Sequence, residues 1–289
     1  MFQGVTKNFN PTELILLLYL LITLPFVIIQ NVVICNGINV LLQHLGYISI
    51  VLLASGCRIK IPNIADRFNW IYTFFPLLFL GFLYKETDYL NNLIFKQNID
   101  YWFINLESSI FGFLPSNNFS IYISSSLFAE SMYFGYFAYY LLIIVIPLVV
   151  YIKKGTVVAR KTIFVIICSF LLYYLFFIFF PVSGPQFYFT DLPQLPQGYF
   201  FGDVIRFIQN LGEAPTAAFP SSHVAMCLIL IYIAYKEIPK LWLWLLPIAI
   251  LLIFSTVYIR AHYAIDVLAA FITAPLAYLT SIYVFKRLK

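Results

Sequence analysis

The sequence predicts an all-α fold, a polytopic bundle of membrane helices. Of its 289 residues, 62% are hydrophobic and only 10% are charged, whereas soluble domains carry about 25% charged residues. Several apolar runs approach the length of about 20 residues that a helix needs to cross the hydrocarbon core. About eight such helices are expected, at residues 13–35, 38–57, 68–84, 133–152, 161–180, 222–236, 240–258 and 262–285.

The predicted helices divide the chain into three parts. Residues 1–84 are expected to form N-terminal transmembrane helices, and residues 133–289 a membrane core that carries the candidate catalytic residues. Residues 85–132 mix charged and aromatic side chains, which is typical of helices that lie in the interface plane. A second long connection, 181–221, is rich in Pro, Gly and aromatic residues, and long loops are where function is expected.

Basic residues predict the orientation of the helices. When the spans alternate across the membrane, only Lys85, Lys96, Arg206 and Arg260 of the 17 Lys and Arg residues fall on the side opposite the N-terminus. Because basic residues are enriched in cytoplasmic loops, both termini are expected in the cytoplasm. The net charge of +5 reflects these loops, so nucleic acid is not an expected partner. The four cysteines have no metal-ligand spacing, so no metal is expected.

A candidate site begins with His262 and Asp266, which follow one apolar run and open the next. The two residues are four apart and therefore share one face of a helix. A carboxylate at this spacing can accept the Nδ1 proton of the imidazole and hold one tautomer. Nε2 of His262 would then be free to act as a nucleophile or a base.

A second motif, Phe219-Pro-Ser-Ser-His223, opens another apolar run. His223 begins the sixth predicted span and His262 the eighth, so parity places both at the same, extracytoplasmic face. Helix N-termini bind phosphate through unpaired backbone N–H groups, and the hydroxyls of Ser221 and Ser222 add donors there. One imidazole can attack phosphorus while the other donates a proton, so the pattern predicts phosphoryl transfer through a phosphohistidine.

These motifs resemble those of the type-2 phosphatidic acid phosphatase superfamily, Pro-Ser-x-His followed by His-x3-Asp. They stand here as Pro220-Ser-Ser-His223 and His262-Tyr-Ala-Ile-Asp266, and the resemblance covers roughly residues 100–280. It is strongest for the branch that contains inositol phosphorylceramide synthase, through Ala218-Phe-Pro-Ser-Ser-His223 and Phe180-Pro-Val-Ser-Gly-Pro185.

The resemblance implies a core of six helices and a reaction without metal or cofactor. By this likeness His262 is the nucleophile and Asp266 is the carboxylate that orients it. His223 would be the general acid that later serves as the base for the acceptor.

Two cationic positions of the family pattern are absent. The Lys that precedes an Arg-Pro pair has no counterpart around Phe180-Pro181, and Thr256 replaces the Arg that precedes the second histidine. Arg260 is the leading substitute because it is two residues from His262 and a guanidinium can bind phosphate in a bidentate manner. The alternative for Arg260 is an interfacial anchor. Arg206 is the second candidate for the phosphate.

Three other polar residues, Glu107, Glu130 and Gln186, are candidate ligands for a polyol or sugar headgroup. The alternative for the two glutamates is a solvated charge. His44 lies in the second predicted span without a motif and is expected to be structural.

The combined expectation is an integral-membrane enzyme, in the cytoplasmic membrane of a bacterium, that cleaves a phosphoester or pyrophosphate of a lipid at the extracytoplasmic face. Water as the acceptor would give a phosphatase, for substrates such as phosphatidic acid, phosphatidylglycerol phosphate or polyprenyl pyrophosphate. A lipid alcohol as the acceptor would give a headgroup transferase, as in inositol phosphorylceramide synthesis.

Two alternatives come from other classes of protein. A vanadate-dependent haloperoxidase would use the same constellation on soluble helices, which the 62% hydrophobic content disfavours. A non-catalytic lipid-binding or translocating protein is the other alternative, because both cationic positions are missing. The sequence leaves the oligomeric state open.

Overall fold

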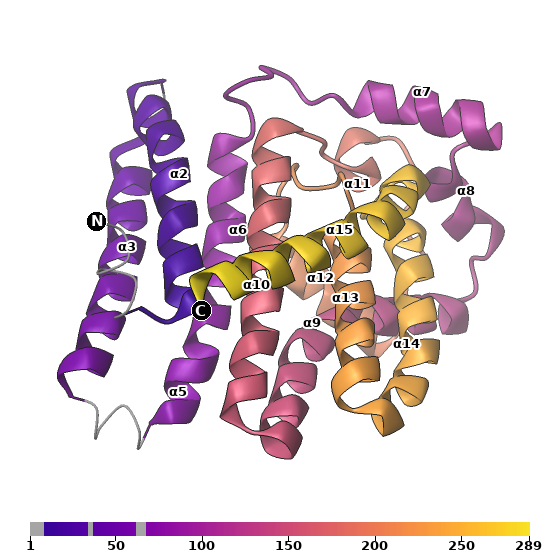
Figure 1. Cartoon of the computed structure of the whole chain (residues 1–289). Coiled ribbons are helices and arrows are strands. Elements are labelled where there is room, and N and C mark those ends of the chain that lie inside the picture. Colours follow the sequence, from indigo (N-terminus) through magenta and orange to yellow (C-terminus); the bar gives the residue numbers. More distant parts are fainter. Residues whose placement is uncertain (1–8, 34–36, 62–67) are drawn as a thin grey trace.

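The structure is a computed structural model that describes residues 9–33, 37–61 and 68–289 (Figure 1). Every regular element in these ranges is a helix, which confirms the predicted all-α class. The last two residues of the predicted first span, 34 and 35, lie outside the described residues. The elements in chain order are α2 (Pro11–Val33), α3 (Gly37–Lys60), α5 (Asn69–Phe74), η1 (Phe75–Leu78), α6 (Phe79–Leu90), α7 (Asp100–Phe111), α8 (Pro115–Tyr122), α9 (Ser126–Lys154), α10 (Thr156–Phe179), α11 (Pro185–Tyr188), α12 (Phe200–Gly212), α13 (Ser222–Glu237), α14 (Pro239–Tyr258) and α15 (Ala264–Leu288).

Six of the described helices are long and apolar enough to cross a membrane: α2, α3, α9, α10, α14 and α15. They confirm a bundle of membrane helices, but two of the eight predicted spans are not among them. One is α13, which has 16 residues. At 1.5 Å per residue it is about 24 Å long, shorter than a hydrocarbon core of about 30 Å. The count of eight therefore stays a prediction.

The other is the predicted third span, 68–84, which the structure divides into α5, the 3-10 helix η1 and α6. Pro76 lies in η1, where its ring removes a backbone donor and disfavours a continuous α-helix. Helix α6 then continues to Leu90, so the segment 85–132 contains the end of α6, all of α7 and α8, and the start of α9. Figure 1 shows α7 lying across one end of the bundle. The division into three parts stays a prediction.

Helix α10 is the central helix of the bundle (Figure 1). In its most apolar stretch 78% of the residues are buried, against at most 44% in each of the other five candidate spans. It packs against α2, α6, α9, α13 and α15. Beside it, α9 and α14 approach closely at Gly135, where a Cβ atom would lie 2.9 Å from Leu251. Helices α9 and α10 thus form the support on which α13, α14 and α15 are placed.

A buried histidine fastens the N-terminal helices to this core. Nδ1 of His44 in α3 lies 2.6 Å from Oε1 of Glu86 in α6, and Nε2 lies 2.9 Å from the carbonyl oxygen of Leu20 in α2. A backbone carbonyl accepts only, and an ionised carboxylate accepts only, so both ring nitrogens donate. We therefore assign an imidazolium paired with the carboxylate of Glu86, and this pair joins three helices.

We predict that His44→Leu strongly destabilises the protein, because it leaves the buried carboxylate of Glu86 without its partner. Breaking a buried ion pair in this way costs about 3–5 kcal/mol. The double variant His44→Leu/Glu86→Leu should recover most of that loss, since neither charge remains. Thermal unfolding of the purified protein in detergent measures both effects. A double variant that unfolds as early as His44→Leu alone would contradict the assigned ion pair.

Candidate active site

The structure brings the two predicted histidines into direct contact. His223 lies in the first turn of α13, and His262 lies in the turn between α14 and α15. Nδ1 of His223 is 3.1 Å from Nε2 of His262, so the two rings share a hydrogen bond. The residues are 39 positions apart in the chain, and only the packing of α13 beside α15 brings them together.

A backbone carbonyl holds the ring of His262. Its Nδ1 lies 2.7 Å from the carbonyl oxygen of Ala218, whereas the nearest oxygen of Asp266, Oδ2, is 3.6 Å away. The expected hydrogen bond between His262 and the Asp266 carboxylate is therefore replaced by one to Ala218. The physical reason is that Oδ2 of Asp266 accepts from the backbone N–H of Tyr263, at 2.8 Å, and so caps the start of α15.

These partners assign the protons of the two rings. A carbonyl oxygen only accepts, so Nδ1 of His262 carries a proton and donates to Ala218. In neutral His262 the Nε2 atom then holds a lone pair, and Nδ1 of His223 must be the donor of the bond between the rings. The lone pair that a nucleophile needs is therefore on the nitrogen that faces His223.

Burial keeps His262 neutral. The side chain is almost fully buried, and burial lowers its pKa from 6.5 to about 4. The hydrogen bond to Ala218 and the charge of Glu213 oppose this shift but are smaller. His262 is thus an unprotonated base at neutral pH, as a nucleophile must be.

Ser221 makes two hydrogen bonds at the start of α13: one caps α13 itself, and the other joins it to the start of α15. Ser221 is the N-cap of α13, and its Oγ accepts from the backbone N–H of Val224 at 3.3 Å. Its own backbone N–H donates to the carbonyl oxygen of Asp266 at 3.2 Å. Ser222 is buried in the first turn. Both serines therefore lie beside the histidine pair, as the motif predicts, and Ser221 links the two motifs directly.

A third segment, 181–185, closes the site. Gly184 has a φ of +89°, and a Cβ atom there would lie 2.8 Å from the carbonyl oxygen of Ala261 and 3.2 Å from Cβ of Ala218. Only glycine meets both conditions, a left-handed backbone and a close approach. The segment thus contacts both histidine motifs at one residue.

Asp100, which the sequence analysis did not single out, holds this segment in place. It is fully buried at the start of α7, and its carboxylate accepts from the backbone N–H groups of Ser183 and Gly184, each at 2.9 Å. The hydroxyl of Tyr263 also donates to it, at 3.0 Å. No local spacing connects Asp100 with residues so far along the chain, so only the tertiary structure reveals it.

Glu107 of α7 lies against the start of α15. Its Oε1 accepts from the backbone N–H of Ala264, and burial raises its pKa to about 7, with the hydrogen bond lowering it and Asp266 raising it. Oε2 of Glu107 and Oδ1 of Asp266 are both buried without a hydrogen-bond partner among the described residues. Glu107 is therefore near the site, bound to the backbone of the helix that follows His262.

Gln186 belongs to a polar cluster centred on Glu213, another residue that the sequence analysis missed. The carboxylate of Glu213 accepts from Nε2 of Gln186 at 2.6 Å, from Nε2 of Gln209 at 3.1 Å and from the hydroxyl of Tyr136 at 2.8 Å. The ring of Tyr136 stacks on His223 with 4.7 Å between centroids. The one sequence signal for Glu213 is its place in the long connection 181–221.

Three side chains that the sequence predicts to contact the substrate have other partners in the described structure. Arg260 is buried and donates to the carbonyl oxygen of Pro193 at 2.6 Å and to Ser120 Oγ at 3.1 Å. Arg206 pairs with Asp203 at 2.7 Å. The carboxylate of Glu130 accepts from three backbone N–H groups at the start of α12, those of Tyr199, Phe201 and Gly202. None of the three side chains forms a hydrogen bond with either histidine, so their predicted roles remain predictions.

A cavity of about 600 Å³ borders His223. Its walls come from η1, α6, α9 and α10, and from the ends of α12 and α13. Most of the lining side chains are apolar, and the polar ones include Lys85, Glu213, Ser222 and His223. His223 therefore borders a largely apolar groove that opens to the surface of the bundle.

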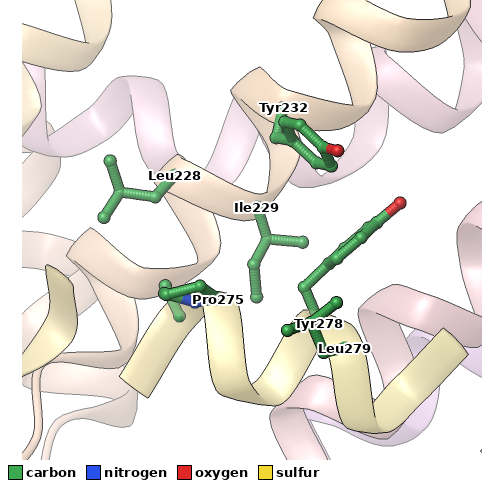
Figure 2. A pocket seen from close by; sticks show the side chains of 7 residues that line it. Leu228, Ile229, Tyr232, Pro275, Tyr278 and Leu279 are labelled. Carbon is green, nitrogen blue, oxygen red and sulfur yellow. The ribbon is translucent and has the colours of Figure 1, made fainter. Parts of the chain in front are cut away.

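A second cavity, of about 300 Å³, lies between α13 and α15. Figure 2 shows its apolar walls, Leu228 and Ile229 on one helix facing Pro275 and Leu279 on the other, with the hydroxyl groups of two tyrosines near one edge. Neither histidine lines this space. It therefore offers no chemistry comparable to that of the larger cavity.

The fold and the site define an integral membrane protein whose polar centre is a pair of histidines at two helix starts. A family model described as the PAP2 superfamily matches residues 102–280 of the 289-residue chain. This is more than half of the chain, so the protein belongs to the PAP2 superfamily, and the predicted relationship to type-2 phosphatidic acid phosphatases is confirmed. Members of this superfamily are generally phosphatases or phosphotransferases. Comparison with curated proteins and with solved structures returned no match.

We predict that burial of neutral His262 makes the stability depend on pH. The unfolded chain takes up a proton near pH 6.5, whereas the folded protein does so near pH 4. The contribution of neutral His262 to the free energy of unfolding is therefore complete above pH 6.5 and is lost as the pH falls towards 4. At pH 5 the loss should reach about 2 kcal/mol.

Thermal unfolding in detergent at about pH 7.5 and about pH 5 measures this loss, with His262→Gln as the variant that removes the titrating group. The drop in unfolding temperature between the two conditions should be smaller in the variant. Equal drops would show that His262 titrates alike in the folded and unfolded states.

Proposed function

We propose that the protein is a lipid phosphatase or phosphotransferase that forms a phosphohistidine at His262. One observation carries the proposal: Nε2 of His262 holds a lone pair, is buried, and faces Nδ1 of His223 at 3.1 Å. A nucleophile and a proton donor within hydrogen-bond reach of each other are what covalent phosphoryl transfer requires.

The first step would transfer the phosphoryl group from the lipid to the enzyme. A phosphate that enters between the two rings breaks the hydrogen bond between His223 and His262. The lone pair on Nε2 of His262 then attacks phosphorus, and the bond between phosphorus and the leaving oxygen breaks. Burial and the neighbouring His262 lower the pKa of His223, so its ring takes up a second proton only beside the negative charge of the bound phosphate. His223 then gives that proton to the leaving oxygen, and the lipid leaves as a neutral alcohol or as a phosphate.

The second step reverses these roles. The hydroxyl of the acceptor attacks phosphorus, and His223 takes its proton. The bond between phosphorus and Nε2 breaks, and its electron pair returns to His262. Throughout, the carbonyl oxygen of Ala218 accepts a hydrogen bond from Nδ1–H of His262, and this bond keeps the reactive nitrogen pointed at the substrate.

The charge of the phosphate needs donors, and the chain offers two candidate sets. The first is the start of α13, with the hydroxyls of Ser221 and Ser222 and the positive end of the helix dipole. The second is Arg260, whose Nε is buried without a hydrogen-bond partner among the described residues. Arg206, which is paired with Asp203, is the weaker candidate.

The acceptor distinguishes the two forms of this function. With water the protein is a phosphatase for a lipid phosphate or pyrophosphate. With a lipid alcohol it is a headgroup transferase of the inositol phosphorylceramide synthase type, which the motifs from Ala218 to His223 and from Phe180 to Pro185 favour. In both forms the active site would face the extracytoplasmic side of a bacterial cytoplasmic membrane, with both termini in the cytoplasm, because basic residues are concentrated on the other side.

We predict that His262→Ala abolishes turnover of every lipid phosphate that the unmodified protein converts, because no phosphohistidine can form. Mass spectrometry of the products, with and without a lipid alcohol, measures turnover and identifies the acceptor. Inorganic phosphate without added alcohol indicates a phosphatase, and a new headgroup-bearing lipid indicates a transferase. Normal turnover in the variant would exclude the mechanism. No turnover by the unmodified protein on any lipid of the panel would favour a binding or translocating protein.

We also predict that Asp266→Asn is milder than His262→Ala. In the serine proteases, loss of the carboxylate that holds the histidine tautomer lowers kcat about 10⁴-fold. Here Ala218 holds that tautomer, and Asp266 lies at 3.6 Å, so the loss in kcat should be well below about 10⁴-fold. Single-turnover kinetics would measure it, and a loss as complete as that of His262→Ala would show that Asp266 is needed for the chemistry itself.

A further inference from the structure

We propose that the cavity beside His223 binds a lipid alcohol, with its hydroxyl group at His223 and its hydrocarbon chain against η1 and α6. This inference rests on the proposed function, and it names the class of molecule that exchanges a proton with His223. It also gives the N-terminal helices a role in substrate binding.

The walls of the cavity fit a hydrocarbon chain. Its volume of about 600 Å³ lies within the range of small-molecule sites, about 300–1,000 Å³. The side chains from η1 and α6 that line it include Leu77, Leu78, Leu80 and Phe82. Those from α9 include Ile143 and Ile144. These six side chains have no donor or acceptor for a headgroup and so fit a hydrocarbon chain, while Lys85 and the tyrosine hydroxyls add polar groups to the lining.

The polar end of the cavity fits a neutral hydroxyl better than a phosphate. Glu213 and His223 both line it. The carboxylate of Glu213 is an acceptor held by three donors from protein side chains, and a carboxylate repels a phosphate while it can still accept from a hydroxyl. The group between Glu213 and His223 should therefore be an O–H donor.

The proposed chemistry requires an alcohol oxygen at the same place. His223 protonates the oxygen that leaves the lipid phosphate, and in the reverse direction it takes the proton of the acceptor hydroxyl. Whether the lipid alcohol is the product of a phosphatase or the acceptor of a transferase, its oxygen lies next to His223. The occupant of the cavity is thus the same molecule class in both forms of the function.

The wall formed by η1 and α6 lies outside the region that the family model matches. The family match begins at residue 102, whereas the cavity is lined by residues 77–85 on that side. The superfamily core alone would leave this wall open. The N-terminal helices are held against the core by the pair of His44 and Glu86, and Glu86 directly follows the last of these wall residues.

The test uses the purified full-length protein in detergent and hexadecanol that carries a photoreactive diazirine near the end of its chain. Irradiation followed by peptide mass spectrometry locates the attached probe. Adducts should fall on residues 77–85 and on the facing part of α9, and unlabelled hexadecanol should compete with them. Adducts spread over the lipid-facing surface, without competition, would overturn the proposal.

A variant fills the cavity without disturbing the fold. Gly81 lines the cavity, and a Cβ atom there would meet no atom within 4 Å. Gly81→Phe should therefore lower competed labelling at least about ten-fold, since single-methylene changes in apolar pockets already alter selectivity about 10–200-fold. Gly56→Phe is the matched control, because Gly56 lies in α3, is equally open and does not line the cavity.

The outcomes separate this inference from the proposed function. Labelling does not need turnover, so adducts in the cavity support the lipid-alcohol site even where no lipid phosphate is converted. Unchanged labelling in Gly81→Phe, with turnover intact in the unmodified protein, would overturn the site and leave the phosphohistidine mechanism standing. An equal loss of labelling in Gly56→Phe would also count against the site, because it would show a general effect on the bundle.

Discussion

The hydrogen bond between His223 and His262 depends on how closely two helix starts can approach. Three backbone contacts set that approach: Ala218 accepts from the ring of His262, Ser221 donates to the carbonyl of Asp266, and Gly184 leaves room for both motifs. Each uses the main chain or the absence of a side chain. The reactive geometry is therefore built into the backbone, which varies less in position than long side chains do.

Acidic side chains organise this backbone. Asp100 binds two N–H groups of the segment 181–185, Asp266 and Glu107 bind those at the start of α15, and Glu130 binds those at the start of α12. In a bundle with few charges, buried carboxylates find their partners among unpaired backbone donors. Glu107 and Glu130, the two acidic candidates for headgroup binding, are among these residues: in the structure each binds backbone N–H groups at a helix start, and the headgroup role stays a prediction.

Local patterns in the sequence predict the fold class and the two histidine motifs, because hydrophobic runs and four-residue spacings are properties of single segments. They do not predict Ala218 as the partner of His262, Asp100 as the anchor of the loop, or Glu213 beside Tyr136. Those contacts join segments that are far apart in the chain. The predicted span 68–84 is divided in the structure by a 3-10 helix that contains Pro76, and α13 has nearly the predicted bounds but is shorter than a full crossing.

The short length of α13 has a consequence for how lipids reach the site. If the far end of a helix of about 24 Å sits at one surface of a membrane about 30 Å thick, its start falls about 6 Å short of the other surface. His223 is at that start. A phosphate must then be drawn below the level of its neighbouring headgroups, or the bilayer must thin locally around the protein. Membrane thickness would thus act as a selector of substrates, favouring lipids whose heads are small enough to descend.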